Sequence, residues 1–344
     1  MYIDKKLKEL GIKPITKLDG RTICNLSNKI AILLVDTFPN YNLNYLKIVD
    51  SLQHTEMYIA EVPKDISPVN YFYKSGTMYI SDNIDINEKN EFILHESIHK
   101  IQEYKNKKEQ LVQLGICHIS ETKIQGMALN EAAVQYIVSK LLKRQNQIVE
   151  IYDMKIPTIS KNYYPIITNL IQQMVFVLGE DLLIESVLNP SEEFKYNAID
   201  NLGEDNFFRI QANFDEILEN KDNILEKQVN NENFLQNIEQ IKVLYFETQK
   251  IILTSYFNNI IPRIETLEEV HQYKNKLIQY RDLVGTEEGL EFYIKYYMDK
   301  TQQIKEIEQK IVTKNNRALT IVNDNKILRI LKKIKNYLTN SFSM

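Results

Sequence analysis

The sequence predicts an α+β protein that is mostly helical, with a small antiparallel sheet and a motif helix (zincin-like), followed by a helical C-terminal region. Only nine Gly and eight Pro occur in 344 residues, which is too few for an all-β chain with many tight turns. Aromatic and β-branched residues concentrate between residues 56 and 81, and helical patterns dominate from residue 162 onward. A composition of 44% hydrophobic and 26% charged residues is typical of a soluble globular protein.

The first part of the chain is expected to form short helices and then the sheet. The expected helices cover residues 4–10, 28–38 and 43–53. The expected strands cover residues 56–62, 69–73 and 77–81. Residues 74–76 read Lys-Ser-Gly and suit a hairpin turn between the last two strands.

Residues 95–99 read His-Glu-Ser-Ile-His, which is the HExxH pattern. Because His95 and His99 are four residues apart, a helix places both imidazoles on one face. This spacing suits two nitrogen ligands of one tetrahedral zinc ion, with Glu96 beside the metal to carry a proton. We expect this helix over residues 87–104, with a capping box at residues 85–88. The alternative is an amphipathic helix that carries two histidines by accident.

A catalytic zinc ion needs a third protein ligand, and Glu131 is the leading candidate. It lies near the start of an apolar helix expected over residues 127–142, where an isolated carboxylate is costly unless it is paired or bound to a metal. His118 and Glu121 compete with it, because both lie between the two helices and could reach a metal. We favour Glu131, since a rigid helix positions a ligand better than a loop does.

The HESIH segment together with the later pair Asn130-Glu131 resembles the gluzincin class of zinc metallopeptidases over residues 77–142. The resemblance implies that Glu131 is the third zinc ligand and that Glu96 is the general base and acid. It also implies that residues 77–81 form the edge strand along which a peptide substrate lies. A metzincin is excluded, because Gln102 and Lys105 stand where that class has Gly and His.

The sequence departs from the gluzincin pattern at Gln135, where many members of the class have an acid that is hydrogen-bonded to a zinc histidine. A glutamine can accept the same hydrogen bond but supplies no charge. The donor to the oxyanion stays open. The resemblance implies a downstream His or Tyr, and the candidates are Tyr163, Tyr164, His118 and His271. Tyr136 is unsuitable, because it points to a different face of its helix from Glu131.

The rest of the chain is expected to be helical. The expected helices cover residues 165–178, 180–188, 206–225, 233–261, 266–284 and 286–314. We expect three domains: a zincin-like catalytic core over 1–150, a helical subdomain that completes the cleft over 151–225, and a helical hairpin or bundle arm over 226–344. Residues 326–338 form a basic amphipathic helix that either packs on its own domain or makes a weak contact with a membrane or a protein partner.

Charge and cysteine content restrict the function further. A net charge of −4 gives no general attraction for nucleic acid, and two cysteines are too few for a disulfide framework. The N-terminus lacks the apolar run of a signal peptide, so we expect a cytoplasmic protein. The sequence therefore predicts a metallopeptidase that holds one zinc ion and cleaves a peptide or protein substrate. The alternative is a helical binding or scaffold protein with an inert HExxH.

Overall fold

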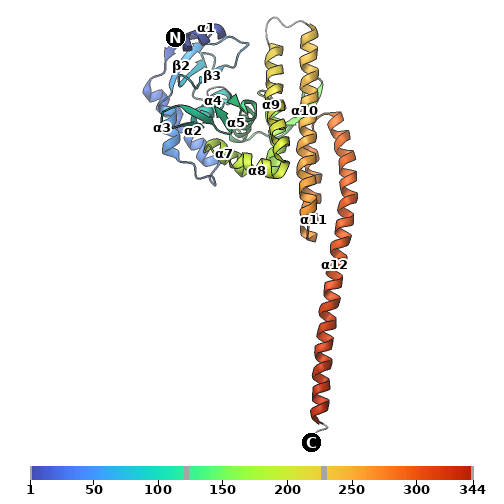
Figure 1. Cartoon of the computed structure of the whole chain (residues 1–344). Helices are drawn as coiled ribbons and strands as arrows, with labels where there is room; N and C mark the ends of the chain where they lie inside the picture. The colour runs from blue at the N-terminus through green and yellow to red at the C-terminus, as the bar shows by residue number, and fades with distance from the viewer. Residues whose placement is uncertain (1, 120–123, 226–230, 342–344) are drawn as a thin grey trace. The chain divides into compact units, whose positions relative to one another are not determined.

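The computed structural model describes residues 2–119, 124–225 and 231–341 (Figure 1). The fold is α+β and mostly helical, with small sheets and a long helical C-terminal region, so the predicted fold class is confirmed. The chain forms two compact units. Unit 1 comprises Met1–Tyr256 and Asp282–Leu290, and unit 2 comprises Phe257–Arg281 and Glu291–Met344. The predicted domain division at residues 150 and 225 remains a prediction.

The principal sheet of unit 1 is mixed, with the strand order β1-β2-β4-β3. Its strands are β1 (Lys13–Lys17), β2 (Glu56–Glu61), β3 (Val69–Phe72) and β4 (Thr77–Ser81). β2 and β4 pair in parallel, whereas β3 and β4 form the expected antiparallel hairpin. The prediction of a purely antiparallel sheet is therefore wrong.

The prediction that residues 77–81 form the edge strand is also wrong, because β4 lies between β2 and β3. Every residue of β4 is buried, which suits an interior strand. A tight turn in which the Gly76 N–H donates to the Phe72 carbonyl folds β3 along the outer side of β4. β3 is thus one edge of the sheet. The other edge is β1, where Pro14 and a register shift are tolerated because one side of the strand is unpaired.

Helices cover both faces of this sheet. α1 (Tyr2–Leu10) packs on the face that carries Tyr58, Ala60 and Tyr79. Since successive residues of a strand face opposite sides, the buried Met57 and Met78 belong to the other face. Figure 1 shows the helices of that side, which are α2 (Gly20–Thr37), α3 (Tyr45–Gln53) and α4 (Glu91–Ile101).

The motif helix α4 is shorter than predicted. It begins at Glu91, directly after the cap residue Asn90, whose Oδ1 accepts the N–H groups of Phe92 and Ile93 at 2.9 and 3.3 Å. The predicted capping box is wrong, because Asp85 instead accepts the Asn87 N–H in a turn before the helix. The helix ends at Ile101, since the chain enters a strand two residues later.

Two further groups of strands were not predicted. A four-stranded antiparallel sheet connects α4 to α5, and it contains β5 (Glu103–Lys105), β6 (Leu111–Leu114), β7 (Cys117–Ile119) and β8 (Ile124–Gln125). A separate hairpin contains β9 (Gln147–Ile151) and β10 (Met154–Thr158). These strands have two to five residues each, which is too short for an alternating pattern to reveal them reliably.

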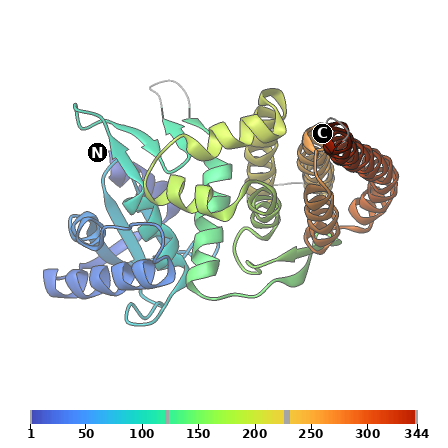
Figure 2. The same ribbon diagram turned by 90° about the horizontal axis from the view of Figure 1, so that it is seen from below.

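The helix α5 (Met127–Leu141) is the central helix of unit 1 and was predicted. It contacts α2, α4, α6 (Pro165–Leu178), α7 (Glu180–Leu188) and α9 (Glu204–Leu225). Figure 2 shows it running through the middle of the unit, and most of its side chains are buried. The helix α8 (Glu193–Leu202), which contacts α9, was not predicted.

Among the described helices, none alone combines the length and apolar character needed to cross a bilayer. The consecutive pair α6 and α7 meets that test only when joined, across a bend of 116°.

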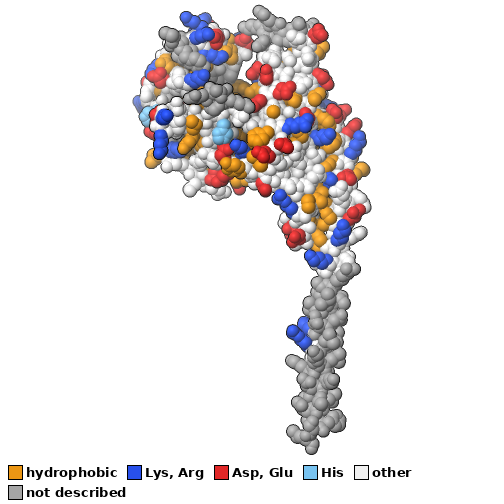
Figure 3. Space-filling view, in the orientation of Figure 1, with side chains coloured by type: hydrophobic (Ala, Val, Ile, Leu, Met, Phe, Trp, Pro, Cys, Tyr) orange, Lys and Arg blue, Asp and Glu red, His pale blue; other side chains and the backbone are white. Residues whose placement is uncertain are grey.

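Unit 2 is helical and has an aromatic interior. It contains the end of α10 (Asn231–Ile260), then α11 (Leu267–Tyr280) and most of α12 (Glu287–Ser341). The Phe257 ring packs edge-on against Tyr273 and Tyr280, with centroids 5.4 and 5.9 Å away. On the face seen in Figure 3, charged side chains of both signs alternate with hydrophobic ones over the described part of this unit.

The predicted basic helix over residues 326–338 lies within α12, which continues as one helix to Ser341. Lys326 and Arg329 are exposed. The other side chains of this segment lie outside the described residues, so its contact with a membrane or a partner remains a prediction.

Candidate metal centre

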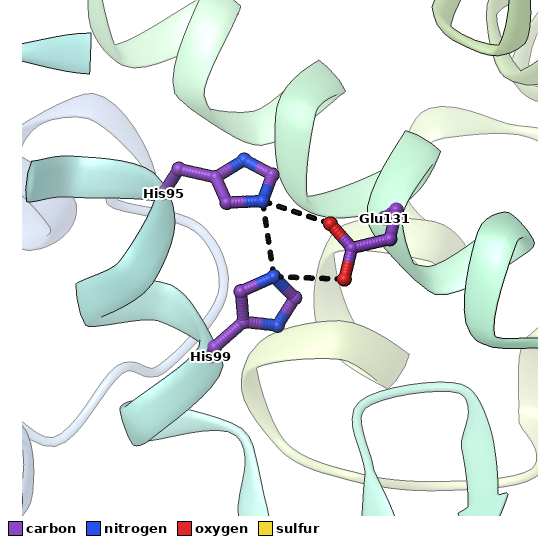
Figure 4. Close-up of side chains that lie close together, drawn as sticks. All are labelled: His95, His99 and Glu131. Atoms are coloured by element: carbon purple, nitrogen blue, oxygen red, sulfur yellow. Dashed lines mark hydrogen bonds and ion pairs between the residues drawn. The ribbon is translucent and has the colours of Figure 1, made fainter. Parts of the chain in front are cut away.

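His95, His99 and Glu131 meet in the interior of unit 1 (Figure 4). The two imidazoles come from successive turns of α4, and the carboxylate reaches them from α5. The Nε2 atoms of His95 and His99 are 3.0 Å apart. The Glu131 carboxylate oxygens lie 3.0 Å from Nε2 of His95 and 3.2 Å from Nε2 of His99. The structure thus brings together the three residues that the sequence selected as metal ligands.

The charge of Glu131 makes this group attractive to a cation. Burial alone lowers the pKa of His99, but the charge and hydrogen bond of Glu131 outweigh burial and raise the pKa from 6.5 to about 8. Burial alone raises the pKa of Glu131, but the two histidines hold it well below its ordinary value. The negative charge of Glu131, close to the two imidazoles, therefore favours either a proton on His99 or a metal ion that all three residues share.

One metal ion fits the triangle of donor atoms. Neighbouring ligands of a tetrahedral zinc ion, with bonds of about 2.0–2.1 Å, lie about 3.3 Å apart. The three observed separations of 3.0 to 3.2 Å are close to this value. Two imidazoles and one carboxylate are also a donor set that zinc takes in catalytic sites. The buried group is therefore consistent with an HExxH…E zinc site and can hold one metal ion.

Each histidine makes a contact to a glutamine through its other ring nitrogen. Nδ1 of His95 lies 3.1 Å from Oε1 of Gln135, as expected for the residue that replaces the acid of the gluzincin pattern. Nδ1 of His99 lies 2.8 Å from the side-chain amide of Gln102. Both glutamines are fully buried. Neutral amides thus orient both imidazoles.

Asn130 does not touch the metal-binding group directly in the contacts that the structure describes. Its Oδ1 accepts the N–H of Ile116 in the turn between β6 and β7. That turn passes close to the group, because a Cβ added to Gly115 would lie 2.5 Å from both Asn130 Oδ1 and Gln102 Oε1. Gly115 has a φ of +53°. Asn130 therefore fixes the turn that lies against Gln102, the partner of His99.

Glu96 lies beside the metal-binding group and is buried. Its Oε2 accepts the backbone N–H of Tyr71, on the edge strand β3, at 3.1 Å. Burial raises the pKa of Glu96, although the neighbouring histidines act in the opposite direction. The carboxyl group therefore takes up a proton more readily than an exposed glutamate does.

A cavity of about 400 Å³ adjoins these residues. Its walls include Glu96, His99 and Glu131. Aromatic side chains form much of the remainder, and they are Tyr71, Phe72, Tyr73, Tyr163 and Tyr164. Lys221 and Asp222 from α9 also line it. A substrate in this cavity would therefore meet the metal-binding group, Glu96 and phenol hydroxyl groups together.

Among the four candidates for the oxyanion donor, the structure brings Tyr163 and Tyr164 to the cavity. The Tyr163 ring packs edge-on against the His95 ring at 5.0 Å. The two tyrosine hydroxyls are 3.4 Å apart. Burial raises the pKa of both phenols, so both remain proton donors at neutral pH. Tyr164 has a φ of +52°, an uncommon backbone conformation for a residue that is not glycine.

The other candidates lie elsewhere. His118 pairs with Glu192, so it is not the third ligand, and Glu121 lies outside the described residues. His271 is on α11 and belongs to unit 2, whereas the described residues that line the cavity all belong to unit 1. Tyr136 donates to Glu180 at 2.6 Å, which agrees with the prediction that it points away from Glu131.

The sequence did not point to Glu91, Arg144, Ser160 or Lys221, all of which lie at or near the centre. A signal existed for Glu91, because it precedes His95 by one helical turn and shares its face of α4. The other three come from segments that only the tertiary fold brings to the site.

No protein-family model, no curated protein and no solved structure matches this chain. The functional argument therefore depends on the geometry of the site.

Proposed function

We propose that the protein is a zinc metallopeptidase of the gluzincin type that cleaves a peptide or protein substrate. The observation that carries this proposal is the position of Glu131. This residue of α5 completes a triangle of donor atoms with the two histidines of α4, and Glu96 lines the same cavity. Zinc is the proposed ion because two imidazoles, one carboxylate and an adjoining cavity suit a catalytic zinc site.

Glu96 is the proposed proton carrier. A bound zinc ion would activate a water molecule and polarise the substrate carbonyl. Glu96 then accepts the proton of the nucleophile and delivers it to the leaving amine. Its raised pKa suits both steps, because a carboxyl group whose pKa is nearer to neutral pH can both accept a proton and give it back. The hydrogen bond from the Tyr71 N–H holds the carboxylate at the cavity wall.

Tyr163 and Tyr164 are the proposed donors to the oxyanion. Both phenols line the cavity and stay protonated, so either can donate a hydrogen bond to the developing negative charge. The edge strand β3 gives the substrate a place to bind. No described strand pairs with its outer side, so an extended peptide can add there, next to the Tyr71 N–H that is bonded to Glu96.

The variant Glu96→Gln tests the chemical proposal. We expect the variant to keep its zinc and to lose about 10²–10⁴-fold in the rate of peptide cleavage, because Gln cannot accept a proton. Cleavage is followed by mass spectrometry on a peptide library. Glu61→Gln, on an exposed residue of β2, is the control and should cleave as the wild type does. Full cleavage by Glu96→Gln would show that the proposed mechanism is wrong.

The alternative of a helical binding or scaffold protein retains one supporting observation. The helices of unit 2 are rich in charge and supply none of the described residues that line the cavity. A purified protein without zinc and without cleavage of the library would favour this alternative. A cytoplasmic location, and a membrane or protein contact through residues 326–338, also remain proposals.

A further inference from the structure

A chain of hydrogen bonds leads from His95 to a buried ion pair. The side-chain Nε2 of Gln135 donates to Oε1 of Glu91 at 2.6 Å and to Oγ of Ser160 at 2.7 Å. Glu91 is buried and bonded by both guanidinium nitrogens of Arg144, one of them at 2.8 Å. On its other side, the Gln135 amide meets Nδ1 of His95.

The partners of Gln135 determine how its amide is turned. The Glu91 carboxylate is paired with both terminal guanidinium nitrogens of Arg144, and a carboxylate can only accept hydrogen bonds. Ser160 uses its own proton on the carbonyl oxygen of Tyr163, at 2.5 Å, so its Oγ also accepts from Gln135. Because Glu91 and Ser160 both accept hydrogen bonds from Gln135, its amide nitrogen must point toward these two residues.

The amide oxygen of Gln135 must then face His95. Because this oxygen only accepts, Nδ1 of His95 donates to it, and Nε2, which lies 3.0 Å from the Glu131 carboxylate, is the atom that would bind a metal ion. The partner of His99 is held differently. The Nε2 of Gln102 faces Nδ1 of His99, and its Oε1 has no hydrogen-bond partner among the described residues, so no second contact fixes this amide as Glu91 and Ser160 fix that of Gln135.

We propose that Glu91, held by Arg144, positions His95 for metal binding by acting through Gln135. This inference rests on the proposed zinc site. In many zinc sites a carboxylate contacts the histidine directly. In this chain the amide of Gln135 lies between them, so the carboxylate of Glu91 acts on His95 through that polarised amide. A buried ion pair gives little net stability, so its presence one helical turn from a metal-binding histidine is explained better by this role.

Glu91→Gln is the first test. The substitution keeps the size of the side chain, removes the charge and lets the Gln135 amide turn over. We expect zinc affinity to fall about 10–100-fold, measured by competition with a chelator on the full chain. The control is Glu180→Gln, which removes a carboxylate from Tyr136, the residue next to Gln135 on α5. Zinc affinity of the control should equal that of the wild type.

A relocated charge separates positioning from general packing. Gln135→Glu alone places two carboxylates against each other and should weaken zinc binding. In the double variant Glu91→Gln with Gln135→Glu, the new carboxylate accepts directly from His95 and the new amide donates to it. We expect the double variant to bind zinc more tightly than either single variant. A double variant weaker than both would overturn the inference.

Unchanged zinc affinity in Glu91→Gln would also overturn the inference. If that variant does not fold, Gln135→Met tests the same step, because it removes the acceptor for His95 and keeps the Glu91–Arg144 pair. Its zinc affinity should fall by a similar factor, and an unchanged value would again overturn the inference. A wild-type protein that binds no zinc would instead refute the proposed function.

Discussion

The interior around α4 and α5 in unit 1 contains charged and amide side chains, whereas the interior of unit 2 is mainly aromatic and aliphatic. In unit 1, fully buried Gln102 and Gln135 contact the two histidines, and fully buried Asn130 fixes the turn next to Gln102. In unit 2, the rings of Phe257, Tyr273 and Tyr280 pack together in the interior, and the acidic residues Glu268 and Glu269 of α11 are exposed. Burying polar groups costs free energy unless each is paired, so an interior with so many of them indicates a function besides stability.

The largest effect on stability is expected in the aromatic interior. Phe257→Ala should lower the free energy of unfolding by about 3–5 kcal/mol, because it removes a fully buried ring that contacts two others. Zinc affinity should not change, since all three proposed ligands belong to unit 1. Thermal unfolding and chelator competition measure the two quantities. A parallel loss of zinc affinity would contradict the separation of stability from function.

Gly115→Ala should lower both the free energy of unfolding and the affinity for zinc. A Cβ at this residue would lie 2.5 Å from the side chains of Gln102 and Asn130, and the φ of +53° disfavours alanine. We expect a loss of about 2–4 kcal/mol in stability, together with weaker zinc binding, because Gln102 orients His99.

Gly76→Ala is the matched control for Gly115→Ala. It has a similar φ of +66° and open space around the new Cβ. It should cost about 1–2 kcal/mol from backbone strain alone and leave zinc affinity unchanged. Equal zinc affinities in the two variants would show that the contact with Gln102 does not matter for metal binding.

The metal-free protein should depend on pH through His99 and Glu131. The pKa of His99 is raised to about 8, so its pairing with Glu131 stabilises the fold fully below pH 6.5 and is lost as the pH rises through 8. The pKa of Glu131 is lowered, so its contribution is present above pH 4.5 and is lost at more acid pH. The expected alkaline loss is about 2 kcal/mol.

Thermal unfolding in the presence of a chelator, from pH 6 to pH 9, measures this dependence. Zinc affinity should change in the opposite sense and increase toward pH 8, because the metal displaces the proton on His99. Glu131→Gln should remove most of the alkaline loss of stability. A wild-type protein whose stability is the same at pH 6.5 and pH 9 would contradict this electrostatic description of the site.

The smallest expected effects come from two helix caps. Asn90 caps α4 and Thr266 caps α11, each through side-chain bonds to backbone N–H groups. Replacing either by Ala should cost about 1 kcal/mol in stability. Only Asn90→Ala should also weaken zinc binding, since α4 carries both histidines. The same loss of affinity in Thr266→Ala would show that the two regions are coupled.

The parts of the centre that the sequence revealed are those encoded by local spacing. His95 and His99 are one helical turn apart, and Glu131 is conspicuous as an acid on an apolar helix. The bounds of α6 and α7 were also predicted, because Pro165 and Gly179 interrupt the helical pattern.

The parts that the sequence did not reveal depend on tertiary pairing. Arg144 and Ser160 reach Glu91 and Gln135 only through the fold, and neither stands at a recognisable spacing from the histidines. The order of the strands was likewise hidden. The composition of residues 69–73 and 77–81 identifies both as strands, but nothing in either segment states which one lies at the edge.

Metal analysis of the purified full-length protein tests the central claim most directly. The geometry of His95, His99 and Glu131 predicts about one zinc ion per chain. It also predicts that Glu131→Ala, with helical content confirmed by circular dichroism, retains almost none. A folded wild-type protein without zinc after equilibration with the metal, or a Glu131→Ala variant that holds zinc as tightly as the wild type, would contradict the account.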